Sequence, residues 1–185
     1  MAGERLTAVA NTNRPRHERA GQVAGADHGS EERRVDARLT PAEVLAALPH
    51  REPFRFVDEI LELDDESVVA ACRFDPAADF YRGHFPGNPI TPGVLLLEAM
   101  AQAGVVAHGI YLMGRRALAP ETPLLTLFTQ AEAEFHGIVA PGERVLVHGR
   151  KLVFRHRLLR SRVRMEREDG TLVCEATLSG VGVAR

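Results

Sequence analysis

The chain of 185 residues contains no tryptophan and only two cysteines, Cys72 and Cys174. They form no CxxC pair and no disulfide-framework spacing, which excludes a small disulfide scaffold. The eight histidines include no HxH or HExxH arrangement, so the sequence predicts no metal site. The formal net charge is only −2, which implies no global attraction to nucleic acid or to an anionic membrane.

Nucleotide-binding and nucleophile motifs are also missing. The stretch GNPITPG, residues 87 to 93, is not a phosphate loop, because its prolines lack the N–H groups that a phosphate needs. The glycines around GHFPG do not match the dinucleotide fingerprint. No GxSxG or cysteine-centred nucleophile pattern is present. The sequence therefore contains no motif for a metal, phosphate or dinucleotide site.

The first 38 residues lack aromatic side chains and any helical or strand period. We expect a disordered N-terminal tail over 1–38, followed by one domain over 39–185. The tail is either a dispensable extension or a docking arm. Its beginning has no continuous apolar stretch of the kind found in a secretory signal, so we expect a cytoplasmic protein.

Local signals then place the ordered elements. LTPAEVLAALPH, residues 39 to 50, predicts a short helix with Thr40 as N-cap and Glu43 completing a capping box. Two strands are expected over 54–63 and 67–74, joined by an acidic turn. Four strand-like runs follow after residue 123: LLTLFTQAEAEFHG, ERVLVHGRKLVF, HRLLRSRVRMER and TLVCEATLSGVGV.

A long apolar run at residues 93 to 114, GVLLLEAMAQAGVVAHGIYLMG, is long enough to cross a bilayer. It carries Glu98, Gln102 and His108, and a charge inside a membrane span is costly. A helix that is apolar on every side can instead be the core of a soluble fold. We favour the second interpretation and expect no membrane span.

These elements predict an α+β fold in which a curved antiparallel sheet wraps one long central helix. In the third run Arg160, Arg162 and Arg164 alternate with apolar or small residues, as expected for a strand with one buried and one solvated face. The basic side chains of this region are candidates for a basic rim, with a plain solvated strand face as the alternative for each: Arg150, Lys151, Arg155, Arg157, Arg160, Arg162 and Arg164.

His84 and Glu98 are the candidate catalytic pair. Histidine titrates near neutral pH and is the usual proton carrier. Glu98 and Gln102 lie one helical turn apart and share a face. Gly93 opens the helix, so its N–H lies at the positive end of the helix dipole, where it can stabilise an oxyanion. Spacing alone favours the simpler explanation, which is a surface or capping histidine and a glutamate placed by the helix dipole.

The motif around these residues resembles a known family. GHFPGNPITPGVLLLEAMAQAG, residues 83 to 104, resembles the signature of the FabZ-type 3-hydroxyacyl-[acyl-carrier-protein] dehydratases. LPHREPFRFVDEILEL, AEFHGIVAPGERVLV and DGTLVCEATL resemble three further segments of that family in the same order. The resemblance covers about residues 40 to 180.

The resemblance implies a hot-dog fold and homodimers with two shared active sites, which in the family often assemble as trimers of dimers. It implies dehydration of a (3R)-3-hydroxyacyl thioester on an acyl carrier protein to the trans-2-enoyl thioester, without a cofactor. His84 would abstract the C2 proton and Glu98 would protonate or orient the departing hydroxyl. Gly93 would hold the thioester oxygen and Gln102 would fix Glu98 or the water.

Phe85 and Val94 complete the set of expected substrate-binding residues. Glutamate at position 98, where the related FabA-type dehydratase/isomerases carry Asp, favours dehydration without isomerisation of the double bond. The sequence departs from the family pattern at Glu52, which follows LPHR, and at Thr91, where the family usually has Met. The resemblance therefore does not define the length of the acyl chain or the identity of the carrier. A hot-dog thioesterase and a non-catalytic acyl-binding subunit are the alternatives.

Overall fold

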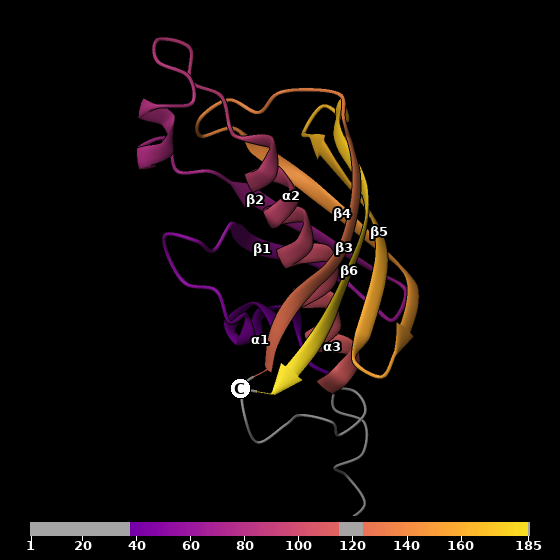
Figure 1. Ribbon diagram of the computed structural model, residues 1–185. Coiled ribbons are helices and arrows are strands. Elements are labelled where there is room, and N and C mark those ends of the chain that lie inside the picture. Colours follow the sequence, from indigo (N-terminus) through magenta and orange to yellow (C-terminus); the bar gives the residue numbers. More distant parts are fainter. Residues whose placement is uncertain (1–37, 115–123, 185) are drawn as a thin grey trace, which may run out of the picture. The chain divides into compact units, whose positions relative to one another are not determined.

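The computed structural model describes residues 38–114 and 124–184 (Figure 1). The expected tail over 1–38 therefore lies outside the described residues, except for Arg38. The helical elements are α1 (Pro41–Ala47), η1 (Asp79–Arg82), α2 (Gly93–Ala101), η2 (Gln102–Ala107) and α3 (His108–Gly114). The strands are β1 (Val57–Leu63), β2 (Ser67–Arg73), β3 (Leu124–Phe135), β4 (Arg144–Arg155), β5 (Leu158–Arg167) and β6 (Leu172–Ala184).

The six strands form one antiparallel sheet in the order β1-β2-β4-β5-β6-β3, so β1 and β3 are its edges. The sheet curves around the α2–η2–α3 helix (Figure 1). This is the predicted hot-dog architecture, with two strands before the helix and four after it. Along β5 exposed and buried residues alternate as expected, with Arg160, Arg162 and Arg164 exposed and Val163 and Met165 buried.

The first helix, α1, begins where its capping residues predict. Thr40 caps α1, where its hydroxyl accepts from Glu43 N at 3.3 Å and its own N–H donates to Glu43 Oε2 at 2.7 Å. Val44 faces inward and is fully buried. The predicted capping box is therefore confirmed.

The central helix differs from the single regular helix that the sequence predicts. Its middle segment, η2, is a π-helix that packs against β1, β2, β4, β5 and β6. Gly104 and Gly149 meet at this contact, where a Cβ on Gly104 would lie 2.6 Å from Val163 Cγ2. The backbone of the helix thus approaches the sheet as closely as glycine permits.

The same helix is long and apolar enough to cross a membrane. Two thirds of its most apolar window is buried inside the protein. Ala99, Met100, Ala103, Ala107 and Tyr111 all belong to the main hydrophobic core. The apolar residues of this helix therefore form part of the protein core, as expected.

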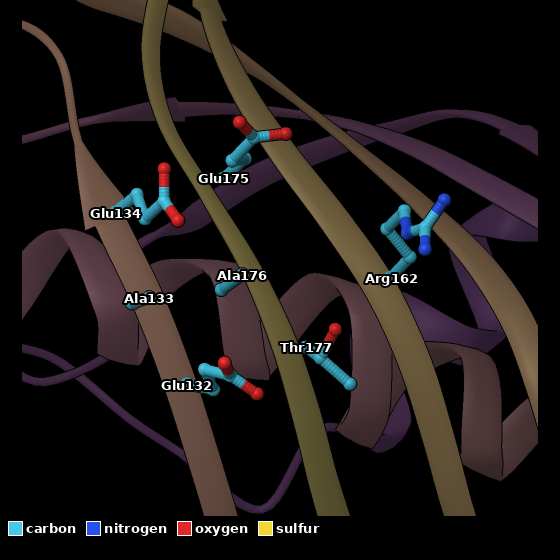
Figure 2. Close-up of a pocket in the computed structure, with 7 residues that line it drawn as sticks. All are labelled: Glu132, Ala133, Glu134, Arg162, Glu175, Ala176 and Thr177. Carbon is cyan, nitrogen blue, oxygen red and sulfur yellow. The ribbon is translucent and has the colours of Figure 1, made fainter.

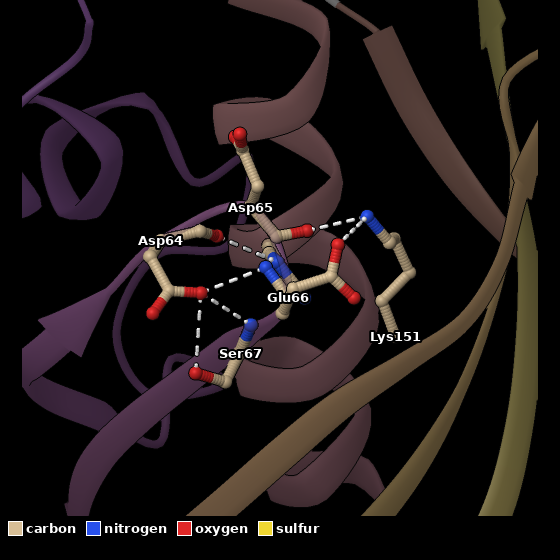
Figure 3. Close-up of polar contacts among 6 residues, drawn as sticks. Asp64, Asp65, Glu66, Ser67 and Lys151 are labelled. Carbon is tan, nitrogen blue, oxygen red and sulfur yellow. Dashed lines mark hydrogen bonds and ion pairs between the residues drawn. The ribbon is translucent and has the colours of Figure 1, made fainter.

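The β1–β2 turn is tied to the helix and to β4 by polar contacts (Figure 3). Asp64 Oδ1 accepts from the N–H groups of Glu66 at 2.7 Å and Ser67 at 2.8 Å. Lys151 Nζ donates to the carbonyl of Asp65 at 2.6 Å and to the carboxylate of Glu66 at 2.8 Å. The fully buried His108 contacts the Asp64 carbonyl through Nε2 at 3.0 Å.

Burial lowers the pKa of His108, while its contact with the Asp64 carbonyl opposes the shift. Just below pH ~6.5, the unfolded chain therefore binds a proton at this histidine more readily than the folded chain does. It follows that the free energy of unfolding falls as the pH drops below that value, by at most about 1.4 kcal/mol per pH unit.

We predict that His108→Leu lowers the stability of the protein at pH 7.5 but flattens its dependence on pH. The difference in unfolding free energy between wild type and this variant should shrink between pH 7.5 and pH 5, as measured by urea unfolding at constant protein concentration. His148→Gln, at a half-exposed position on β4, is the control. Parallel stability curves for wild type and His108→Leu would contradict the argument.

Candidate active site

Glu98 stands on the second turn of α2, with its side chain 22% exposed. Its Oε1 accepts a hydrogen bond from Gln102 Nε2 at 3.0 Å, one helical turn further on. The carboxyl therefore lies at the border between the buried helix and solvent, and one of its oxygens is already held.

Gln102 is fully buried, and both ends of its amide are occupied. Oε1 accepts from Phe56 N at 2.9 Å, while Nε2 donates to the Phe54 carbonyl at 2.8 Å as well as to Glu98. These bonds hold residues 54–56 against the helix, which is why β1 begins at Val57 and not at Phe54 as the sequence predicts. The amide orientation is fixed by the backbone, so Nε2 can only point toward Glu98.

His84 follows η1 in the loop that leads to α2. Its N–H donates to the Phe80 carbonyl at 3.0 Å, and its own carbonyl accepts from Ile90 N at 3.0 Å. The ring contacts the Ile90 carbonyl through Nδ1 at 3.0 Å. A carbonyl can only accept, so Nδ1 carries the proton, and in the neutral ring Nε2 keeps the lone pair. The loop thus presents His84 as a base through Nε2.

A second contact closes the same loop. The hydroxyl of the buried Tyr81 lies 2.6 Å from Thr91 Oγ1, and Thr91 is itself 3% exposed. Thr91 N donates to the Val139 carbonyl at 2.9 Å, which ties the loop to the segment before β4. Sequence reasoning gave Tyr81 no role and treated Thr91 only as a departure from the family pattern. The two form a buried polar pair that joins the ends of the His84 loop.

Gly93 is the first residue of α2, as predicted, and follows Pro92. A Cβ at this position would lie 3.2 Å from the ring of Phe135, so any larger residue would crowd the helix start. The first N–H groups of a helix have no acceptor within it. Next to Gly93, the side chain of Val94 is 73% exposed, and Phe85, stacked on the His84 ring, is 54% exposed.

A cavity extends from Glu98 between the central helix and the sheet. It is lined by His50, Glu98, Ala101, Val105, Val106, Thr126, Phe128, Ser179 and Gly180. Most of these walls are apolar or small, while Glu98 and His50 supply its titratable groups. His50 Nε2 lies 3.6 Å from Glu98 Oε1. Sequence reasoning quoted this histidine within LPHREPF but assigned it no role, and no local signal links it to Glu98, which lies far away in the sequence.

The two predicted catalytic residues are not joined within one chain. Among the described residues, no hydrogen bond or ion pair connects His84 to Glu98. Gln102 contacts Glu98, and Phe85 stacks on His84. Gly93 and Val94 lie at the start of α2, between these two pairs in the sequence. Within the described residues, His84 and Glu98 therefore belong to two separate sets of contacts.

The outer face of the sheet carries a separate polar hollow (Figure 2). It is lined by Glu132, Ala133, Glu134, Arg162, Glu175, Ala176 and Thr177. Glu134, His136 and Glu175 offer three ligand atoms within 4.8 Å of one another, which makes them the described residues best arranged to hold a cation. These three side chains are exposed or half-buried, and His136 already pairs with Glu175 at 3.4 Å. The hollow does not include any residue of the Glu98 cavity.

Comparison with known proteins identifies the family of the chain. The family model of the FabA-like domain matches residues 48–177. A 3-hydroxyacyl-[acyl-carrier-protein] dehydratase FabZ of Thermus thermophilus is 41% identical over 113 residues, which is 61% of this chain and 76% of that protein. A FabZ of Methylobacterium radiotolerans is 40% identical over 141 residues, covering 75% of this chain and 85% of the relative.

Among solved structures, the dehydratase heterocomplex ApeI:P from Xenorhabdus doucetiae matches with a TM-score of 0.65. The match covers 80% of this chain and 94% of the other at 16% identity, so it supports the fold alone. Fold and family model together define a hot-dog protein of the FabA-like family. Within that family the chain belongs to the FabZ-type 3-hydroxyacyl-[acyl-carrier-protein] dehydratases.

The Tyr81–Thr91 contact can be tested by a double-mutant cycle. We predict that Tyr81→Phe and Thr91→Val each lower the free energy of unfolding by about 1–2 kcal/mol, because each leaves a buried hydroxyl or its partner unpaired. The double variant should lose little more than either single variant, since one interaction is removed in all three. Additive losses in thermal or urea unfolding would show that the two hydroxyls do not interact.

Proposed function

We propose that the protein dehydrates (3R)-3-hydroxyacyl thioesters, carried on an acyl carrier protein, to trans-2-enoyl thioesters. The observation that carries the proposal is the state of His84: its Nδ1–H is used by the Ile90 carbonyl, so Nε2 is left as a base in a loop of the FabZ motif. Family membership supplies the reaction, and fatty acid or related polyketide, polyene or lipid synthesis is its setting, in the cytoplasm.

In this reaction His84 Nε2 takes the proton from C2 of the substrate. The electrons of that C–H bond form the C2–C3 double bond as the C3–O bond breaks. Glu98 delivers the proton with which the 3-hydroxyl leaves as water. The Gly93 N–H stabilises the negative charge that develops on the thioester oxygen. The thioester itself acidifies the C2 proton, so the mechanism requires no metal or organic cofactor.

The remaining site residues hold and shape the substrate. Gln102 keeps the Glu98 carboxyl in place through its 3.0 Å hydrogen bond. Phe85 and Val94 contact the substrate near the helix start. The acyl chain extends along the cavity between Val105 and Phe128. Apolar walls of this kind suit a saturated chain.

We further propose that active sites are shared in a homodimer, with His84 of one chain facing Glu98 of the other. The edge strand β3 supports this arrangement, because Leu127, Phe128 and Phe135 are about half exposed along it. An apolar, unpaired edge of this length is a pairing surface. Dimers of this kind can assemble further into a trimer of dimers.

The reaction can be tested with a 3-hydroxyacyl thioester on carrier protein, following enoyl absorbance and free thiol together. We predict enoyl formation by the wild type and a loss of at least about 100-fold in His84→Ala and in Glu98→Gln, because each variant removes one proton-transfer group. His148→Gln should retain full activity. Thiol release in place of enoyl formation would establish a thioesterase instead.

Shared sites make a separate prediction about mixtures of the two inactive variants. His84→Ala and Glu98→Gln subunits, dissociated and allowed to reassociate at equal amounts, should regain about a quarter of wild-type activity. Half of the dimers are then mixed, and each mixed dimer has one intact site. If each site lay within one chain, no activity would return, although native mass spectrometry would still detect the mixed dimers.

A further inference from the structure

His50 is held beside Glu98 by the segment that follows α1. The guanidinium of Arg51 donates to the carbonyls of Leu48 and His50, the second at 2.8 Å, which stiffens this segment. The Gln102 amide fixes the same stretch a few residues later at Phe54. The side chains of His50 and Glu98 are each 22% exposed, and both line the cavity. His50 therefore meets Glu98 from an element other than the central helix.

The surroundings of the ring select its tautomer. Nδ1 of His50 is buried and has no hydrogen-bond partner among the described residues. A proton there would be a buried donor without an acceptor, which costs about 1–3 kcal/mol. On Nε2 the proton instead faces the Glu98 carboxyl at 3.6 Å. The favoured form of neutral His50 is thus the Nε2–H tautomer.

Few charges act on this ring. Glu98 approaches from α2 and raises the pKa of His50, while burial has the larger effect and lowers it, aided by Arg51 of the same segment. The cavity walls contributed by β3 and β6 are uncharged. His50 therefore acts as a neutral hydrogen-bond donor at neutral pH.

We propose that His50 is a positioning residue for the dehydration, holding Glu98 through Nε2–H together with the Gln102 amide. This role rests on the proposed function. Both groups approach Oε1 of Glu98, so Oε2 remains for the departing hydroxyl of the substrate. The separation of 3.6 Å is longer than a hydrogen bond, and such contacts commonly tighten when substrate binds.

The kinetic test compares His50→Leu, which removes the donor, with His50→Gln, whose amide N–H can reach the place of Nε2. We expect His50→Leu to lower kcat about tenfold with KM nearly unchanged, and His50→Gln to stay within about threefold of wild type. His148→Gln, which alters a similar His–Glu contact on the outer face of β4, is the matched control and should change nothing.

A second test needs no catalysis and no change at position 50. The imidazole of His50 is titrated by NMR in the wild type and in Glu98→Gln. Since Glu98 raises the pKa of His50, its neutralisation should lower that pKa further. An unchanged His50 pKa in Glu98→Gln overturns the proposal even if His50→Leu fails to fold.

The remaining outcomes separate the two proposals. Normal dehydration with an unchanged kcat in His50→Leu overturns the role of His50 and leaves the proposed function standing. A wild-type protein that forms no enoyl product on any carrier overturns the proposed function and, with it, this role. Equal loss of kcat in His50→Leu and His50→Gln would also reject donation from Nε2.

Discussion

The buried amide of Gln102 connects the fold to the candidate site. It joins the central helix to the backbone at Phe54 and Phe56 and also donates to Glu98. An amide buried among apolar side chains is tolerated only when its donors and acceptor are paired, and here the backbone supplies most of the pairing. A displacement of residues 54–56 would break the bonds that orient the Gln102 amide, and this amide also holds the Glu98 carboxyl. The position of the carboxyl therefore depends on the packing of the domain.

That coupling depends on how closely the helix can approach the sheet. Gly104 of the helix and Gly149 of the sheet have no Cβ, so the two backbones come into close contact there. The side chain of Val163 packs against Gly104 at the same point. The π-helical segment lies at this point and contacts five strands. A helix seated so deeply cannot shift along the sheet without steric overlap. Glu98 lies one turn before this segment. Its distance from the sheet is therefore fixed by the helix packing, and its orientation by Gln102.

The fold could be predicted largely from the sequence, because its signals are local or periodic. The capping box at Thr40, the alternation along β5 and the apolar run at 93–114 each correspond to an observed element. The π-helical segment and the release of Phe54–Phe56 from β1 could not be predicted, since both depend on contacts between distant residues. His50 was missed for the same reason: 48 positions separate it from Glu98, and nothing in LPHREPF alone indicates that contact. The family motif pointed to His84, Glu98 and Gly93, but it does not indicate which imidazole nitrogen of His84 contacts the Ile90 carbonyl.

The two candidate proton-transfer groups have matching arrangements. His84 is tethered through Nδ1 to a backbone carbonyl and presents Nε2, whereas Glu98 is tethered through Oε1 and leaves Oε2. Each group thus has one atom anchored by its own chain and one atom available to react. In the homodimer proposed above, anchoring before assembly means that the second chain need not order these side chains; it need only bring them to the same substrate. The entropy cost of forming the proposed shared site would then fall on the subunit interface, where burial of the exposed apolar residues of β3 would offset it.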